Sequence, residues 1–220
     1  MSYNYNNEFF TALNNTKNLG FHEDVKEFSD KNYFENGCNQ LLLDLFPVFQ
    51  WISKEKSMPG LPGHKQLIMS IISNCGPFHN YIKPIVEKLL NCKAYITVGY
   101  IKVGDIQEMH KIDLQTIENS IKNKRFPSQH HVWLTLDSGE ILDLTFQTTF
   151  DSLHNSHEFN QALDEGYLPI STTCRSTKDL KNGFEYHPVV IGKEVLKEAK
   201  YDLEELSRAI VFNKYPSHLI

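Results

Sequence analysis

The chain lacks a long apolar run and an excess of basic residues, and these absences exclude two classes of protein. Its longest apolar stretch, 41–49, is interrupted by Asp44 and Pro47 and is too short to span a bilayer. No basic segment followed by an apolar one opens the sequence, so we expect no secretory signal. The net charge of −5 argues against a nucleic-acid partner. We therefore expect a cytoplasmic protein without membrane or nucleic-acid partners, and secretion without a cleaved signal stays an alternative.

Closely spaced cysteines are also missing. The four cysteines lie far apart, at Cys38, Cys75, Cys92 and Cys174. Without a CxxC motif or a Cys/His ligand spacing, a structural zinc site is not expected. His154 and His157 lie three residues apart but lack an acidic or cysteine partner at ligand spacing, so we interpret them as surface histidines. The sequence thus predicts neither a metal nor a cofactor, while a disulfide stays possible.

Length and composition favour one compact domain. The chain has 220 residues, of which 40% are hydrophobic and 22% are charged. The run of proline and glycine at 58–63 is the best internal boundary. We expect a single α+β domain over 1–220, with helices packed against a small antiparallel sheet. Its parts would be a helical segment at 1–57, a core at 64–146 and a C-terminal α/β extension at 147–220.

Hydrophobic periodicity predicts the secondary structure around this core. The expected helices lie near 9–13, 41–49, 111–121, 158–163 and 193–212, and the expected strands near 94–103 and 186–191. Pro47 should break the second helix, and Asp113 should cap the third. The basic run at 122–125 is interpreted as a solvated helix end rather than as a phosphate site. It belongs to an insertion, 104–129, that either shapes a cleft or is a surface excursion.

A β-hairpin is the clearest local motif. Two segments rich in aliphatic and β-branched residues, 132–136 and 141–146, flank a short turn. Gly139 suits the left-handed position of a type I turn with a G1 bulge. In that register Leu136 pairs with Glu140, and the pairing of all other residues in the hairpin follows.

The hairpin register decides whether a histidine and a carboxylate meet. With the bulged turn, His131 and Asp143 share a face and lie on a diagonal within reach of each other. A plain two-residue turn would instead put them on opposite faces. His130 points to the other face in the bulged register, so we prefer His131 as the base of a candidate site.

Cys75 precedes a predicted helix. Pro77 suits the first helical position, where its missing N–H is not needed. The apolar stripe of this helix is Phe78, Ile82, Ile85, Val86 and Leu89. A thiol at a helix N-terminus has a lowered pKa and reacts as the thiolate. The alternative is an inert buried thiol. Pro84 should kink or split the helix after its second turn.

These elements in this order resemble the core of the transglutaminase-like superfamily of papain-related enzymes. The resemblance rests on Cys-Gly at 75–76, the strand 94–100, His-Val-Trp at 131–133 and Leu-Asp-Leu-Thr at 142–145. It covers about a third of the chain, 73–146. A leucine stands where the family usually has a proline after the aspartate, and a glycine stands where an aromatic residue often follows the cysteine.

The resemblance implies a catalytic triad. Cys75 would be the nucleophile, His131 the general base and acid, and Asp143 the orienting acid. The Cys75 N–H and one more donor would hold the oxyanion; Gln66 and Asn74 are the candidates for that donor, and each is also readily explained as an ordinary polar residue. No cofactor is needed.

The resemblance fixes a type of chemistry and no substrate. Members of the superfamily cleave peptides, remove glycans from asparagine, transamidate or acetylate arylamines, and some are inactive. We therefore expect a cysteine-dependent amide hydrolase or acyl transferase acting on a peptide or protein. The alternatives are a non-catalytic binding or scaffold protein that keeps the fold, and a small-molecule N-acyltransferase.

Overall fold

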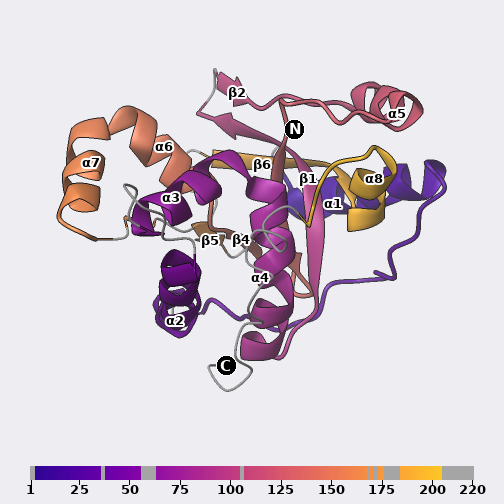
Figure 1. Cartoon of the computed structure of the whole chain (residues 1–220). Coiled ribbons are helices and arrows are strands. Elements are labelled where there is room, and N and C mark those ends of the chain that lie inside the picture. The colour runs from indigo at the N-terminus through magenta and orange to yellow at the C-terminus, as the bar shows by residue number, and fades with distance from the viewer. Residues whose placement is uncertain are drawn as a thin grey trace.

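Helices pack on both faces of a small antiparallel sheet in the computed structural model (Figure 1). The structure describes residues 3–35, 38–55, 63–104, 107–167, 169–170, 173–175 and 184–204. The helices are α1 (Tyr5–Asn18), α2 (Asn39–Glu55), α3 (Gly63–Ser73), α4 (Cys75–Leu90), α5 (Leu114–Asn123), α6 (Phe146–His154), α7 (Ser156–Asp164) and α8 (Lys193–Glu198). The strands are β1 (Ala94–Val103), β2 (Gln107–Met109), β3 (His131–Leu136), β4 (Ile141–Asp143), β5 (Thr173–Arg175) and β6 (Phe184–Ile191). The α+β class expected from the sequence is confirmed.

Strand β1 organises the sheet, because three strands pair with it. β3 pairs with its first half and β2 with its end, while β6 pairs with residues 97–103. Since a strand has two edges and β6 overlaps both partners, β2 and β3 follow each other along one edge and β6 occupies the other. From β3 the sheet continues through β4 to β5, and every pairing is antiparallel. The expected strands at 94–103 and 186–191 are therefore confirmed.

The alternation of side chains along β1 separates two cores. Ile96 and Val98 lie in a core with residues of α2, α3 and α4. Tyr95 lies in a second core with Trp133 and residues of α1, on the other side of the sheet. Figure 1 accordingly shows α4 in front of the sheet and α1 behind it. The start of α4 thereby comes close to the β3–β4 hairpin.

Contrary to the expectation from the sequence, Pro47 does not break α2 and Pro84 does not split α4. Pro47 lies inside α2 and Pro84 inside α4, and both helices continue past them. A proline inside a helix removes one backbone hydrogen bond and crowds the preceding turn. Buried apolar faces on both sides of each proline offset that cost; they include Leu45 and Val48 in α2 and Ile82 and Ile85 in α4.

Two expected boundaries are wrong. The strand expected over 141–146 ends at Asp143, and α6 begins at Phe146. The helix expected over 193–212 ends at Glu198, because Lys200 adopts a left-handed φ of 60°. Residues 205–212 of that expectation lie outside the described residues, as do 58–62 of the proline and glycine run.

Three expected helices and one expected helix cap are confirmed. α1, α5 and α7 form where helices were expected, and Asp113 caps α5 by accepting a 2.8 Å hydrogen bond from Thr116 N–H.

None of the helices in the described ranges is both long and apolar enough to cross a membrane. Within the same ranges, no three His, Cys, Asp or Glu side chains gather where they would hold a metal ion.

Candidate active site

The N-terminus of α4 presents the candidate nucleophile. The helix begins at Cys75 itself, with Asn74 as the N-cap. The sequence indicated that Pro77 is the first helical residue, but it is the third. The position still suits a proline, because the first turn of a helix has no acceptor for its N–H groups. Cys75 is a partly exposed free thiol at the positive end of the helix dipole, which favours the thiolate.

The β3–β4 hairpin has the register expected from its turn. Leu134 pairs with Leu142, and Leu136 N–H donates a 2.8 Å hydrogen bond to the Glu140 carbonyl. Gly139 adopts a left-handed φ of 84°, as the bulged turn requires. This register places the candidate histidine and aspartate on one face.

His131 and Asp143 form a direct, buried contact. His131 Nε2 lies 2.7 Å from Asp143 Oδ2, and both side chains are almost fully buried. Because a carboxylate only accepts, Nε2 carries the hydrogen and Nδ1 is left to face the thiol. Tyr186 O–H also donates to Oδ2, at 3.0 Å. The other oxygen, Oδ1, accepts from Thr145 N–H at 2.9 Å and from Phe146 N–H at 3.0 Å. The carboxylate is thus held by donors on both oxygens.

The thiol and the histidine line one small cavity. It has a volume of about 90 Å³ and is lined by Ile72, Cys75, His110, Ser128, His130, His131, Thr145, Phe146, Thr149 and Tyr201. Burial opposes the thiolate, but the interactions of the thiol with His130 and His131 outweigh it and lower the pKa of Cys75 to about 6. The structure thus brings together the three residues that the sequence had singled out.

The electrostatics of the three groups favour an ion pair. Burial disfavours the imidazolium of His131, but the charge and hydrogen bond of Asp143, followed by Cys75, raise its pKa to about 10. Burial likewise opposes the Asp143 carboxylate, but His131 holds its pKa well below the usual range. The lowered thiol pKa and the raised imidazole pKa together favour a Cys75 thiolate beside a His131 imidazolium at neutral pH.

The sequence predicted that His130 points away from the site, but in the structure His130 lines the cavity of the thiol. β3 begins at His131, so the alternation of a strand does not extend to its neighbour. Nδ1 of His130 lies 2.8 Å from the Pro127 carbonyl oxygen, which only accepts, so Nδ1 carries the hydrogen. Nε2 is buried and meets no partner in hydrogen-bond geometry within the described part of the chain.

Sequence reasoning missed His79, which is fully buried one helical turn after Cys75. Its Nε2 accepts a 3.1 Å hydrogen bond from Leu144 N–H, so its Nδ1 donates to the Cys75 carbonyl oxygen at 2.8 Å. Nε2 also lies 3.7 Å from Asp143 Oδ1. Burial lowers the pKa of His79 to about 4, so this last contact is not an ion pair at neutral pH. Its spacing of four residues from the cysteine was the only signal in the sequence.

Aromatic rings surround His131. His110 stacks on it with ring centres 5.8 Å apart, and Trp133 stacks on it at 6.0 Å. Burial, followed by the charges of His131 and His130, lowers the pKa of His110 to about 4. No sequence pattern pointed to His110, because it comes from the insertion that precedes the hairpin.

Of the two residues suggested as oxyanion donors, Asn74 is not among the described residues that line the cavity of the thiol. Asn74 lines a larger neighbouring cavity. Gln66 belongs to α3, but its side chain lies outside the described residues. The backbone N–H of Cys75, at the start of α4, is the donor that the position of the helix supplies.

Comparisons of the chain with models of protein families, with curated proteins and with solved structures found no match. Geometry and chemistry alone therefore carry the functional interpretation.

Proposed function

We propose that this chain is a cysteine-dependent amide hydrolase or acyl transferase that acts on a peptide or protein. In this proposal α4 and the β3–β4 hairpin form a transglutaminase-like core. Cys75 is the nucleophile, His131 the general acid and base, and Asp143 the residue that orients His131. The proposal is supported above all by the continuous contact from thiol to imidazole to buried carboxylate, with a thiol pKa of about 6.

The first half of the reaction forms a thioester. The Cys75 thiolate attacks the carbonyl carbon of an amide, a C–S bond forms, and the carbonyl electron pair moves to oxygen. The N–H of Cys75 at the start of α4 stabilises this oxyanion. The oxyanion then collapses, His131 gives its proton to the departing nitrogen, and the C–N bond breaks. An amine leaves, and the acyl group stays on Cys75.

The second half returns the enzyme to its starting state. Water or an acceptor amine attacks the thioester carbonyl while neutral His131 takes a proton from it. Collapse of the second oxyanion breaks the C–S bond and restores the thiolate beside the imidazolium. Asp143 keeps the same ring nitrogen protonated throughout, so Nδ1 stays the reacting atom. Water gives hydrolysis and an amine gives transfer.

The pH dependence of alkylation tests the reactive pair. Iodoacetamide reacts with the thiolate, whose fraction rises as the pH passes upward through the thiol pKa. We expect the rate at Cys75 to rise around pH 6 and to level off by about pH 7, one unit above that pKa. In His131→Ala the midpoint should move toward about 8.5, the ordinary thiol value. Mass spectrometry of the labelled peptides gives the rate at each cysteine.

The chain contains two controls for this experiment. Burial, followed by the charges of Asp137 and Glu87, raises the pKa of Cys92 to about 12, so its labelling should stay slow over the whole range. His157→Ala removes an exposed histidine of α7 and should leave the midpoint unchanged. A wild-type midpoint near 8.5, or one that does not respond to His131→Ala, would favour a non-catalytic scaffold. Acylation of Cys75 by a coenzyme A thioester would favour a small-molecule N-acyltransferase.

A further inference from the structure

A larger cavity adjoins the one that holds the thiol. It has a volume of about 750 Å³ and is lined by Asn74, Lys124, Arg125, Phe126, Pro127, Ser128, His130, Lys200, Tyr201 and Asp202. Ser128, His130 and Tyr201 line both cavities. Asn74 is the residue immediately before Cys75. The larger cavity therefore lies next to the cavity of the candidate nucleophile and shares walls with it.

The cleft is basic in a chain whose net charge is −5. Lys124, Arg125 and Lys200 line it, against a single carboxylate, Asp202. Lys124 pairs with Glu198 of α8, which leaves two cations to consider. In the part of the chain that the structure describes, neither Arg125 nor Lys200 forms an ion pair. Among the described residues that line the cleft, three cations therefore face one carboxylate, and Lys200 also helps to lower the pKa of Glu198.

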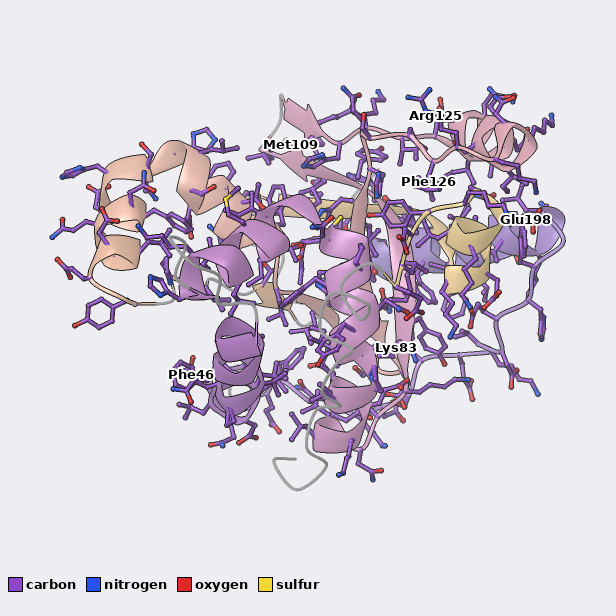
Figure 2. The ribbon with its side chains drawn as sticks, in the orientation of Figure 1. Phe46, Lys83, Met109, Arg125, Phe126 and Glu198 are labelled. Atoms are coloured by element: carbon purple, nitrogen blue, oxygen red, sulfur yellow. The ribbon has the colours of Figure 1, made fainter. Side chains whose placement is uncertain are left out.

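Two helix ends meet at the cleft, and each carries a lysine in an unusual backbone conformation. Lys124 ends α5 with φ of 52°, and Lys200 follows α8 with φ of 60°. Glycine or asparagine usually occupies this left-handed position. Figure 2 shows Arg125 and Phe126 beside α5 and Glu198 on α8, on the same side of the molecule. A lysine at the end of a helix is common, because its charge complements the negative end of the helix dipole. Lys124 and Lys200 differ from ordinary helix-end lysines in their position, because they line a cleft beside Cys75.

We propose that this basic cleft binds carboxylate side chains of an acidic peptide whose neighbouring amide is presented to Cys75. Arg125 offers a planar fork of donors that matches a carboxylate, and Lys200 offers a point charge. The rings of Phe126 and Tyr201, 5.3 Å apart, supply apolar wall for the peptide chain. Unpaired cations in a cleft raise the local concentration of anions. The proposal rests on the proposed function, since it names the substrate class of that same site.

Two alkylating reagents of similar size but different charge test the cleft. Iodoacetate is anionic and iodoacetamide is neutral, and both form the same C–S bond at Cys75 with loss of iodide. The ratio of their rates reports the potential at the thiolate. We expect Arg125→Gln combined with Lys200→Met to lower the iodoacetate-to-iodoacetamide ratio about threefold at low salt. Sodium chloride should lower the wild-type ratio in the same direction, and this measurement needs no variant.

Lys122→Met is the matched control, because it removes one charge from the same helix end at a residue that does not line the cleft. Its ratio should equal that of the wild type. An unchanged ratio in the double variant, with a normal iodoacetamide rate, overturns the cleft proposal and leaves the proposed function standing. Slow reaction of wild-type Cys75 with iodoacetamide overturns the proposed function, and the substrate proposal falls with it.

Protection of Cys75 from iodoacetamide distinguishes the sources of the anion. Acetylated triglutamate amide should slow the labelling, and acetylated triglutamine amide should not. Inorganic phosphate that protects as well as triglutamate would overturn the assignment to an acidic peptide. Protection by triglutamate that persists in the double variant would overturn the assignment to this cleft.

Discussion

At the scale of single residues, His79 joins the candidate nucleophile to the candidate acid. It donates to the Cys75 carbonyl and accepts from Leu144 N–H, the residue after Asp143. The neutral ring can do both only because its two nitrogens play different roles. His79 therefore fixes the start of α4 against the turn that follows β4. We interpret it as a positioning residue that acts through Cys75 and Asp143.

Two substitutions at His79 separate positioning from general stability. His79→Leu removes both hydrogen bonds, so Asp143 should orient His131 less well and the Cys75 thiol pKa should rise by about one unit. His79→Gln keeps a donor and an acceptor and should restore part of that shift. The pH midpoint of iodoacetamide labelling measures both. A midpoint that stays near 6 in a folded His79→Leu variant would show that His79 serves packing alone.

The same substitutions have a second readout in acid. Because burial lowers the pKa of His79 to about 4 from an ordinary value near 6.5, the folded state favours its neutral form. This contribution to stability is complete above the unfolded value and is lost as the pH falls toward the folded one. As the pH falls from about 6.5 to about 4, the free energy of unfolding should therefore decrease less in His79→Gln than in the wild type. Urea denaturation at several pH values measures the difference, and parallel losses would contradict it.

At the scale of elements, one extra residue in β6, Val189, determines how β6 lies beside β1. The register between the two strands shifts between Val98 and Gly99. A Cβ atom at Gly99 would lie only 2.0 Å from the backbone carbonyl oxygen of His187 and 2.9 Å from the Trp133 ring. β6 also carries Tyr186, whose hydroxyl donates to Asp143. A side chain at Gly99 would therefore disturb both the sheet and one support of the site.

Gly99→Ala should destabilise the fold strongly. The clash involves backbone, which moves less easily than the end of a side chain, and we expect a loss of about 3 kcal/mol or more in the free energy of unfolding. Gly20→Asn is the control, because a Cβ atom at Gly20 meets nothing within 4 Å and asparagine tolerates its φ of 87°. Urea denaturation compares the two variants. A loss below about 1 kcal/mol for Gly99→Ala would mean that β6 can shift away.

The elements that the sequence predicted well depend on local chemistry. The left-handed Gly139 determines the hairpin register, and the register brings His131 to Asp143. Asp113 likewise caps α5 through its own side chain. In both cases the residues that decide the structure lie within a few positions of one another, so a pattern in the sequence contains the answer.

The predictions that failed depended on tertiary contacts or on where an element ends. Leu144 and Thr145 alternate like a strand, but Asp143 accepts from the N–H groups that follow it and so favours the turn into α6. His130 lies before the strand and is oriented by the Pro127 carbonyl. Pro84 stays within α4 because the helix is buried on both sides of it. None of these outcomes follows from the local pattern of apolar residues.

At the scale of the whole molecule, α1 forms hydrogen bonds with β6, near the other end of the described chain, and with β3. Thr16 O–H lies 3.1 Å from the Ile191 carbonyl oxygen and accepts from Ile191 N–H at 2.7 Å. Tyr5 O–H accepts from the Trp133 indole N–H at 2.9 Å. Trp133 stacks on His131, so α1 supports the far side of the candidate site. The segment 5–18 and the strand β6 should therefore unfold together with the hairpin, as parts of one cooperative unit.

Truncation of one core aromatic residue in α1 tests this unity. Phe9 is fully buried, whereas its neighbour Phe10 is only partly buried. Phe9→Ala should lower the free energy of unfolding by about 3–5 kcal/mol, and Phe10→Ala should cost clearly less. Hydrogen exchange should then speed up by the same factor in α1, β6 and β3, because all three open only in the global event. Faster exchange confined to α1 would show instead that the helix detaches by itself, and the thiol pKa would then stay at about 6.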